Sequence, residues 1–119
     1  MALEFFLDRD QGCVSVNLSG NLTLSPQLSK FAGHVTALFS TRGVTGVLLD
    51  LSKVDGLDSA GLGELVILYT AAGEANCALC LVQPAERGLL LLAMTRLAEL
   101  FPQFGDEESA KKWLRSLAP

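Results

Sequence analysis

The hydrophobic and polar positions at the start of the chain follow a period of two. Residues 3–7 form a short, mainly apolar run, and residues 13–18 alternate between apolar and polar or small side chains. A period of two is typical of strands, because successive side chains point to opposite faces. The polar, glycine-containing stretch at residues 8–12 predicts a turn between the two runs. This part of the chain therefore predicts an antiparallel hairpin that ends at Gly20.

The clearest helical period begins at Ser25 and Pro26. Serine is a favoured N-cap residue and proline a favoured first helical residue, so this pair predicts a helix start. The apolar positions that follow recur every three or four residues and form one stripe. They are Leu28, Phe31, Ala32, Val35, Leu38 and Phe39. Gly43 ends the predicted helix.

The rest of the chain alternates between apolar strands and helical segments. Residues 44–51 are almost continuously apolar, which is typical of a strand covered on both faces of a largely parallel sheet. The later elements are expected as a loop at 52–58, a helix at 59–75, a strand at 78–82, a helix at 84–97, a strand at 101–104 and a helix at 106–117. The order β-β-α-β-α-β-α-β-α predicts a single α/β domain over residues 1–119, built on one mixed, mostly parallel sheet.

The composition supports one folded domain and argues against several kinds of partner. Half of the 119 residues are hydrophobic and 18% are charged, so the chain can build a core. A net charge of -4 and scattered basic residues offer no surface for nucleic acid. We find no apolar stretch of the ~20 residues that a membrane span needs, and no secretory signal. We expect a cytoplasmic protein that binds another protein or a small molecule.

The most informative segment covers residues 49–63. It predicts the end of a buried strand, a polar loop, and a helix that begins at Asp58 or Ser59. Either residue can cap the free backbone N–H groups of the first turn. Gly61 and Gly63 follow inside the helix, where each glycine costs about 1 kcal/mol relative to alanine. This cost indicates that something approaches the backbone closely here.

The same segment resembles the STAS domain family, and in particular its anti-sigma factor antagonists. Residues 58–63 read D-S-A-G-L-G and match the family signature D-S-[SAT]-G-L-G at every position. Residues 49–54, L-D-L-S-K-V, match the strand that usually leads into it. The resemblance extends over the whole chain, and it implies a STAS fold whose helices pack mainly on one face of the sheet.

The resemblance also implies a function. In this family the serine after the aspartate is phosphorylated by a partner kinase that doubles as an anti-sigma factor, which here assigns the phosphorylation site to Ser59. The protein would be a non-catalytic switch without cofactor or metal, and a monomer or weak dimer. Unphosphorylated, it would bind the anti-sigma factor serine kinase and free the sigma factor, and a PP2C-type serine phosphatase would reset it. The expected partner-binding residues are Asn21, Thr23, Asp58, Ser59, Ala60, Gly61, Leu62, Gly63 and Glu64.

The turn at residues 20–23 departs from the family. Many members have an acidic G-E-L-D sequence there, whereas this chain has G-N-L-T. If those acids normally contact the kinase, the partner of this chain docks differently or belongs to a different class.

A phosphate on Ser59 should leave the fold intact and weaken the binding of a partner at this surface. A phosphoryl group adds about −1.5 to −2 charges, which a helix N-terminus tolerates because its dipole and free N–H groups favour anions. Asp58 and Glu64 are close in sequence, so the modified surface would become strongly negative. A partner packed against it would face like-charge repulsion and a desolvation cost.

Other interpretations rest on single features. Cys77 and Cys80 form a C-x-x-C pattern, but residues three apart in a strand point to opposite faces, so we interpret them as core residues rather than a zinc or redox pair. His34 precedes Ser59 and lies off the apolar stripe of its helix, so a serine hydrolase is not expected. A different class stays open: a soluble STAS subunit of an ABC-type lipid transport complex would use the same fold and the Ser59 loop as a docking surface.

A run of four leucines at residues 89–92 adds one further expectation. Four successive helical residues span about 300° of the circumference, so Leu90 or Leu91 should be partly exposed. We expect them to contribute to an interface, unless the last helix covers them with Trp113 and Leu114.

Overall fold

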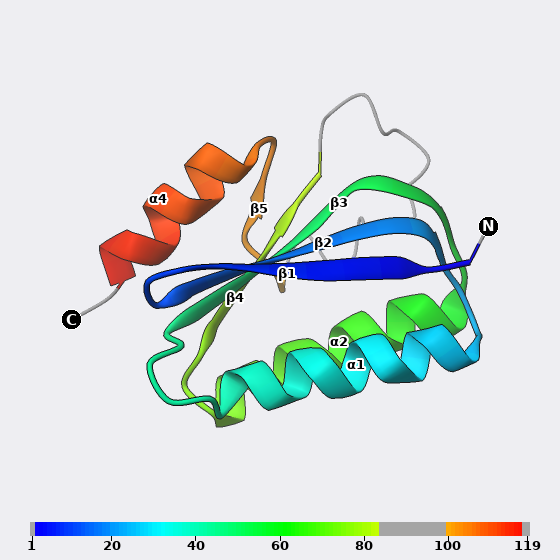
Figure 1. Ribbon diagram of the computed structural model, residues 1–119, viewed down its shortest axis with the longest axis horizontal. Coiled ribbons are helices and arrows are strands. Elements are labelled where there is room, and N and C mark those ends of the chain that lie inside the picture. Colours follow the sequence, from blue (N-terminus) through cyan, green and yellow to red (C-terminus); the bar gives the residue numbers. More distant parts are fainter. Residues whose placement is uncertain (1, 84–99, 118–119) are drawn as a thin grey trace.

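The computed structural model of the protein describes residues 2–83 and 100–117 (Figure 1). Its elements are β1 Glu4–Asp10, β2 Cys13–Leu22, α1 Pro26–Phe39, β3 Gly46–Leu57, α2 Ser59–Glu74, β4 Ala78–Val82, β5 Gln103–Phe104 and α4 Glu107–Leu117. The predicted helix at 84–97 and the leucine run at 89–92 lie outside the described residues. The described elements follow the predicted order.

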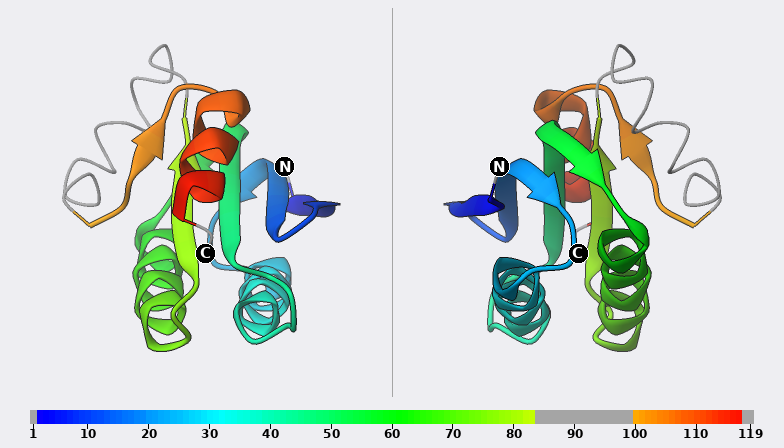
Figure 2. Two further views of the ribbon diagram at one scale, coloured as in Figure 1. Left: turned by 90° about the vertical axis from the view of Figure 1, so that its left-hand side faces the viewer. Right: turned by 90° about the vertical axis from the view of Figure 1, so that its right-hand side faces the viewer.

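The five strands form one mixed sheet in the order β1-β2-β3-β4-β5. β1 pairs antiparallel with β2 as the predicted hairpin, and the other three pairings are parallel. Strand alternation sends Val14 and Val16 to a core beneath α1 and α2, and Cys13 to a smaller core beneath α4. Figures 1 and 2 show α1 and α2 side by side on one face of the sheet and α4 across the other.

The start of α1 is built as its sequence predicts. The Ser25 hydroxyl accepts a hydrogen bond from the Leu28 N–H at 3.2 Å, and Pro26 is the first helical residue. The apolar stripe faces the sheet, and its fully covered members are Leu28, Phe31, Val35 and Phe39. His34 lies on the exposed side, as expected.

Three strands are longer than the sequence predicts. β1 runs to Asp10, so that the turn narrows to residues 11–12, and β2 continues through Gly20 to Leu22. Gly20 does not end the strand, because its positive φ of 88° accommodates an irregularity in the pairing with β3. β3 extends through the predicted loop at 52–58 as far as Leu57. The extended pairing carries the end of β2 to the start of α2.

The two cysteines of the C-x-x-C pattern lie in different cores. Cys77 packs among the residues beneath α1 and α2, whereas Cys80 packs with Cys13 beneath α4. All three thiols are buried and free. Burial raises the pKa of Cys80 to about 12. The prediction that Cys77 and Cys80 are core residues on opposite faces is confirmed.

Candidate functional site

The start of α2 is capped by Asp58. Its backbone is extended, and its Oδ1 atom accepts a hydrogen bond from the Gly61 N–H at 2.9 Å. Its Oδ2 atom accepts a second bond, at 3.0 Å, from the N–H of Leu24, a residue of the loop after β2. One carboxylate therefore closes the helix end and holds a loop that lies 34 residues earlier in the chain.

These two bonds also fix the charge of Asp58. The hydrogen bond from Leu24, followed by the one from Gly61, holds the pKa of this carboxyl below its ordinary value. Hydrogen bonds to the charged form favour ionisation, and the N-terminus of a helix adds to that preference. The carboxylate is thus committed to the backbone of its own chain.

Ser59 is left free by this arrangement. It is the first helical residue and is exposed, and its hydroxyl makes no hydrogen bond to any of the described residues. The sequence left open whether Asp58 or Ser59 caps the helix, and the structure assigns the cap to Asp58. The Ser59 hydroxyl is therefore accessible to another molecule that approaches from solvent.

The two glycines of the signature differ in their surroundings. A Cβ atom on Gly61 would collide with the carbonyl oxygen of Leu22, which is backbone and cannot retreat. A Cβ atom on Gly63 would have no atom within 4 Å. Close packing of α2 against the end of β2 therefore explains Gly61, while nothing described in this chain requires glycine at position 63.

The end of β2, which contains Asn21, and the loop residue Thr23 that follows it lie against this helix start. The Asp58 N–H donates to the Leu22 carbonyl at 3.4 Å, and a Cβ atom on Gly56 would lie 2.9 Å from Oδ1 of Asn21. Asn21 and Thr23 are both half-buried. The structure thus brings together the two predicted parts of the contact surface, residues 21–23 and 58–64.

Some predicted contact residues also serve the core. Ala60 and Leu62 are partly buried and pack against the core beneath α1 and α2. Glu64 is half-buried and lies 100° around the helix from Gly63. These three residues are less exposed than Ser59.

Sequence reasoning missed one conspicuous residue, Leu24. Its side chain is 80% exposed although its backbone is held by Asp58. An apolar residue just before an N-cap usually packs on the fourth helical residue, but in α1 that residue is the polar Ser29. The polar residue at that position was the available signal that Leu24 has no partner within its own helix.

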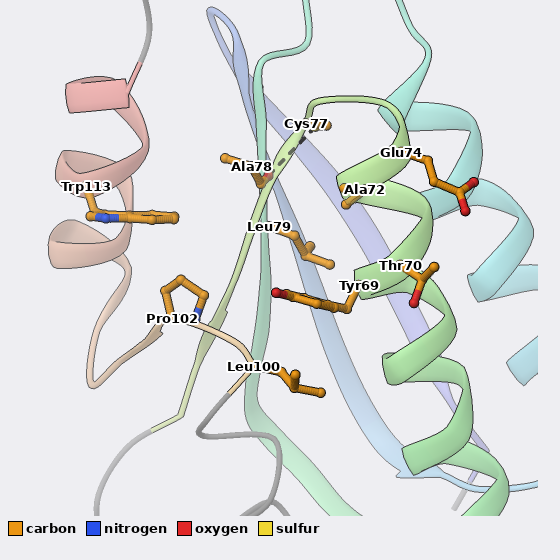
Figure 3. Close-up of a pocket in the computed structure, with 11 residues that line it drawn as sticks. Tyr69, Thr70, Ala72, Glu74, Cys77, Ala78, Leu79, Leu100, Pro102 and Trp113 are labelled. Atoms are coloured by element: carbon orange, nitrogen blue, oxygen red, sulfur yellow. Dashed lines mark hydrogen bonds between the residues drawn. The ribbon is translucent and has the colours of Figure 1, made fainter.

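A cavity of about 610 Å³ opens at the opposite end of α2 from Ser59 (Figure 3). Leu79 of β4 and Tyr69 of α2 lie together on one side of the strand, and Pro102 and Trp113 of α4 lie on its other side. The walls are mostly apolar, and among the described lining residues Glu74 carries the one side chain that is charged near neutral pH. No motif pointed to this cavity, and it is separate from the Ser59 surface.

The fold and the signature identify the family. The STAS domain model matches residues 6–110, so the chain belongs to the STAS domain family. A search of curated proteins finds no match. Within residues 2–83 and 100–117, no helix combines the length and hydropathy needed to cross a membrane.

Solved structures with this fold include an anti-sigma factor antagonist from Mycobacterium paratuberculosis, with a TM-score of 0.78 and 23% identity over 96% of this chain and 95% of that one. Unphosphorylated SpoIIAA, an anti-sigma factor antagonist, matches with a TM-score of 0.75 and 16% identity over 98% of this chain and 100% of its own. The Bacillus cell fate determinant SpoIIAA in its phosphorylated form gives 0.67 and 15% over 92% and 98%.

Proposed function

We propose that this protein is a non-catalytic anti-sigma factor antagonist of the cytoplasm, switched by phosphorylation of Ser59. Unphosphorylated, it binds an anti-sigma factor serine kinase and thereby frees the sigma factor. Transfer of the γ-phosphoryl group of ATP to the Ser59 hydroxyl ends that binding, and hydrolysis by a PP2C-type phosphatase restores it.

The observation that carries the proposal is the division of roles between Asp58 and Ser59. Because Asp58 supplies the N-cap, the Ser59 hydroxyl is exposed and can be modified without uncapping α2. A phosphate at this position meets the positive end of the helix dipole, so the fold tolerates it. Structures of SpoIIAA in both unphosphorylated and phosphorylated forms, which share this fold, support the proposal.

The test is phosphorylation of the intact protein with ATP by the serine kinases of the histidine-kinase-like fold from the same genome. We expect intact-mass and peptide mapping to find one phosphate, on Ser59. Ser59→Ala should abolish labelling while circular dichroism shows an unchanged fold, and Ser59→Glu should weaken kinase binding.

Two outcomes would contradict the proposal. Phosphate on Ser52 or Thr70 with Ser59 unmodified would place the switch elsewhere. Absence of labelling by every such kinase, together with co-purification with a membrane transport complex, would favour the transport subunit instead. Ser29→Ala serves as the control, because it removes an exposed serine hydroxyl that does not cap a helix.

A further inference from the structure

The exposed side of α2 carries no charge over almost its whole length. Its outward-facing positions are exposed or half-buried and follow one line along the helix; they are Ser59, Gly63, Val66, Ile67, Thr70 and Gly73. We name these residues the α2 outer face. The first charged residue on this side is Glu74, at the end of the helix. The solvent-facing side of a helix ordinarily carries charged residues, and depletion of charged residues is a compositional signal of the centre of an interface.

Exposed apolar side chains lie near Ser59 both on α2 and on the loop that follows β2. Ile67 is 58% exposed and Val66 is 37% exposed, while Leu24 reaches 80% from the neighbouring loop. The Asp58 carboxylate fixes the backbone of Leu24 beside the helix start. Because its backbone is already held in place, Leu24 gives up less conformational freedom when a partner covers it.

Gly63 supplies an independent observation. Glycine weakens a helix interior relative to alanine, and in this chain no described atom lies where its Cβ would be. The residue before it on the same line is Ser59, one helical turn away. Glycine at position 63 lowers the helix surface next to the Ser59 hydroxyl, where an approaching enzyme must make contact.

We infer that Leu24 and the α2 outer face form one docking surface for the kinase that phosphorylates Ser59, and that the kinase presents an apolar, uncharged surface to it. The inference rests on the proposed function and adds the residues that choose the partner. A typical interface covers about 800 Å² per partner, a patch with a radius of roughly 16 Å. Ile67 lies eight residues beyond Ser59, about 12 Å along the helix, and falls within that reach.

This surface also explains how one phosphate can release the partner. None of the residues of the α2 outer face, nor Leu24, offers a basic group to pair with a phosphate. The modified Ser59 would place close to two negative charges against an apolar surface, where an unpaired charge is costly to bury. The apolar, uncharged character that favours partner binding therefore also makes that binding sensitive to phosphorylation of Ser59.

The experiment measures phosphorylation of Leu24→Asp and Ile67→Asp by the kinase that labels wild-type Ser59. We expect each variant to lower kcat/KM by about tenfold or more, chiefly through KM, with Ser59 still the site. Leu24→Ala and Ile67→Ala should weaken binding in the same direction without adding charge, and they keep the test valid if an aspartate variant fails to fold.

The matched control is Phe6→Asp. Phe6 is 65% exposed, and it lies on the other side of the sheet because its neighbour Phe5 packs on Phe31 of α1. Adding the same charge there should leave kcat/KM unchanged. Folded Leu24 and Ile67 variants phosphorylated as efficiently as wild type would overturn the docking surface alone, whereas an unlabelled wild-type Ser59 would overturn the proposed function and this inference with it. A wild-type dimer that Ile67→Asp converts to a monomer with unchanged phosphorylation would assign the surface to a second copy of this chain and also overturn the inference.

Discussion

At the scale of single residues, the start of α2 depends on a side chain with two acceptor atoms. Oδ1 of Asp58 binds the helix and Oδ2 binds the loop residue Leu24. A serine cap has one oxygen and a shorter reach, so Ser59 could replace the first bond but not both. The requirement for both bonds explains why the neighbouring hydroxyl stays free for chemistry.

Substitution of the two glycines by alanine should separate packing from recognition. Gly61→Ala should lower the free energy of unfolding by about 1–3 kcal/mol or more, because its Cβ would press on the Leu22 carbonyl. Gly63→Ala should raise it by up to about 1 kcal/mol, because alanine favours the helix and meets no neighbour. Urea unfolding followed by circular dichroism measures both, and a Gly63→Ala protein less stable than wild type would contradict the assignment.

At the scale of elements, the features that depend on local sequence signals were predicted correctly, and those that depend on long-range strand pairing were not. α1 could be placed from its cap and stripe because each signal lies within a few residues of the element it defines. The last part of β3 was interpreted as loop, because Ser52, Lys53 and Asp55 interrupt its apolar run. Those residues are strand because β2 pairs with them, and a pairing between distant segments leaves no local mark on the sequence.

The candidate site was predictable to a similar extent. The signature singled out Ser59, and ordinary capping rules predicted a helix start at Asp58 or Ser59 without deciding between them. The bond from Leu24 to Asp58 could not be predicted, because it depends on where β2 ends beside β3. Exposure of Leu24 and Ile67 depends on the same tertiary arrangement.

The attachment of α4 to the sheet should depend on pH. Burial, followed by a hydrogen bond and the charge of Asp50, raises the pKa of Glu107 in the first turn of α4. A raised carboxyl pKa means that the folded state holds the proton of Glu107 more tightly than the unfolded state does. Protonated Glu107 therefore stabilises the fold below the unfolded pKa of about 4.3, and this contribution is lost as the pH rises through the folded pKa.

Glu107→Gln should therefore raise the melting temperature near pH 7 and leave it almost unchanged near pH 4. The amide can donate to Asp50 at either pH, and the ion pair that it removes, between Glu107 and Lys111, is long at 3.8 Å. Differential scanning calorimetry measures the effect, with Glu108→Gln as the control for removal of a carboxylate from the same turn. A lower melting temperature at both pH values would show that the ion pair and the helix dipole outweigh Asp50.

At the scale of the whole molecule, one sheet supports two separate cores. α1 and α2 cover the larger one and α4 the smaller one, and β3 and β4 contribute side chains to both. The cysteines report on the two sides: Cys77 lies in the larger core, and Cys13 and Cys80 lie in the smaller one. The reactivity of these thiols can therefore be used to follow the unfolding of each core separately.

All three thiols should be unreactive in the native protein. Each is less than a tenth exposed, and burial raises the pKa of each, so very little thiolate is present near neutral pH. An aromatic disulfide reagent should titrate none of them before denaturation and all three afterwards. Variants that retain Cys77 alone or Cys80 alone should react at rates that rise only with denaturant. Rapid reaction of native Cys77, or a reversible Cys77–Cys80 disulfide, would contradict their placement as core residues.

The hydrogen bond that joins Leu24 to Asp58 has a consequence for signalling. The neighbourhood of Ser59 is assembled from two stretches of chain 34 residues apart, and it exists only after the sheet has brought them together. Under the proposed function, a nascent, misfolded or proteolysed copy would not present this composite epitope and would not enter the phosphorylation cycle. Only folded molecules would then take part in signalling. The amount of anti-sigma factor bound would depend on the concentration of folded protein rather than on the amount synthesised.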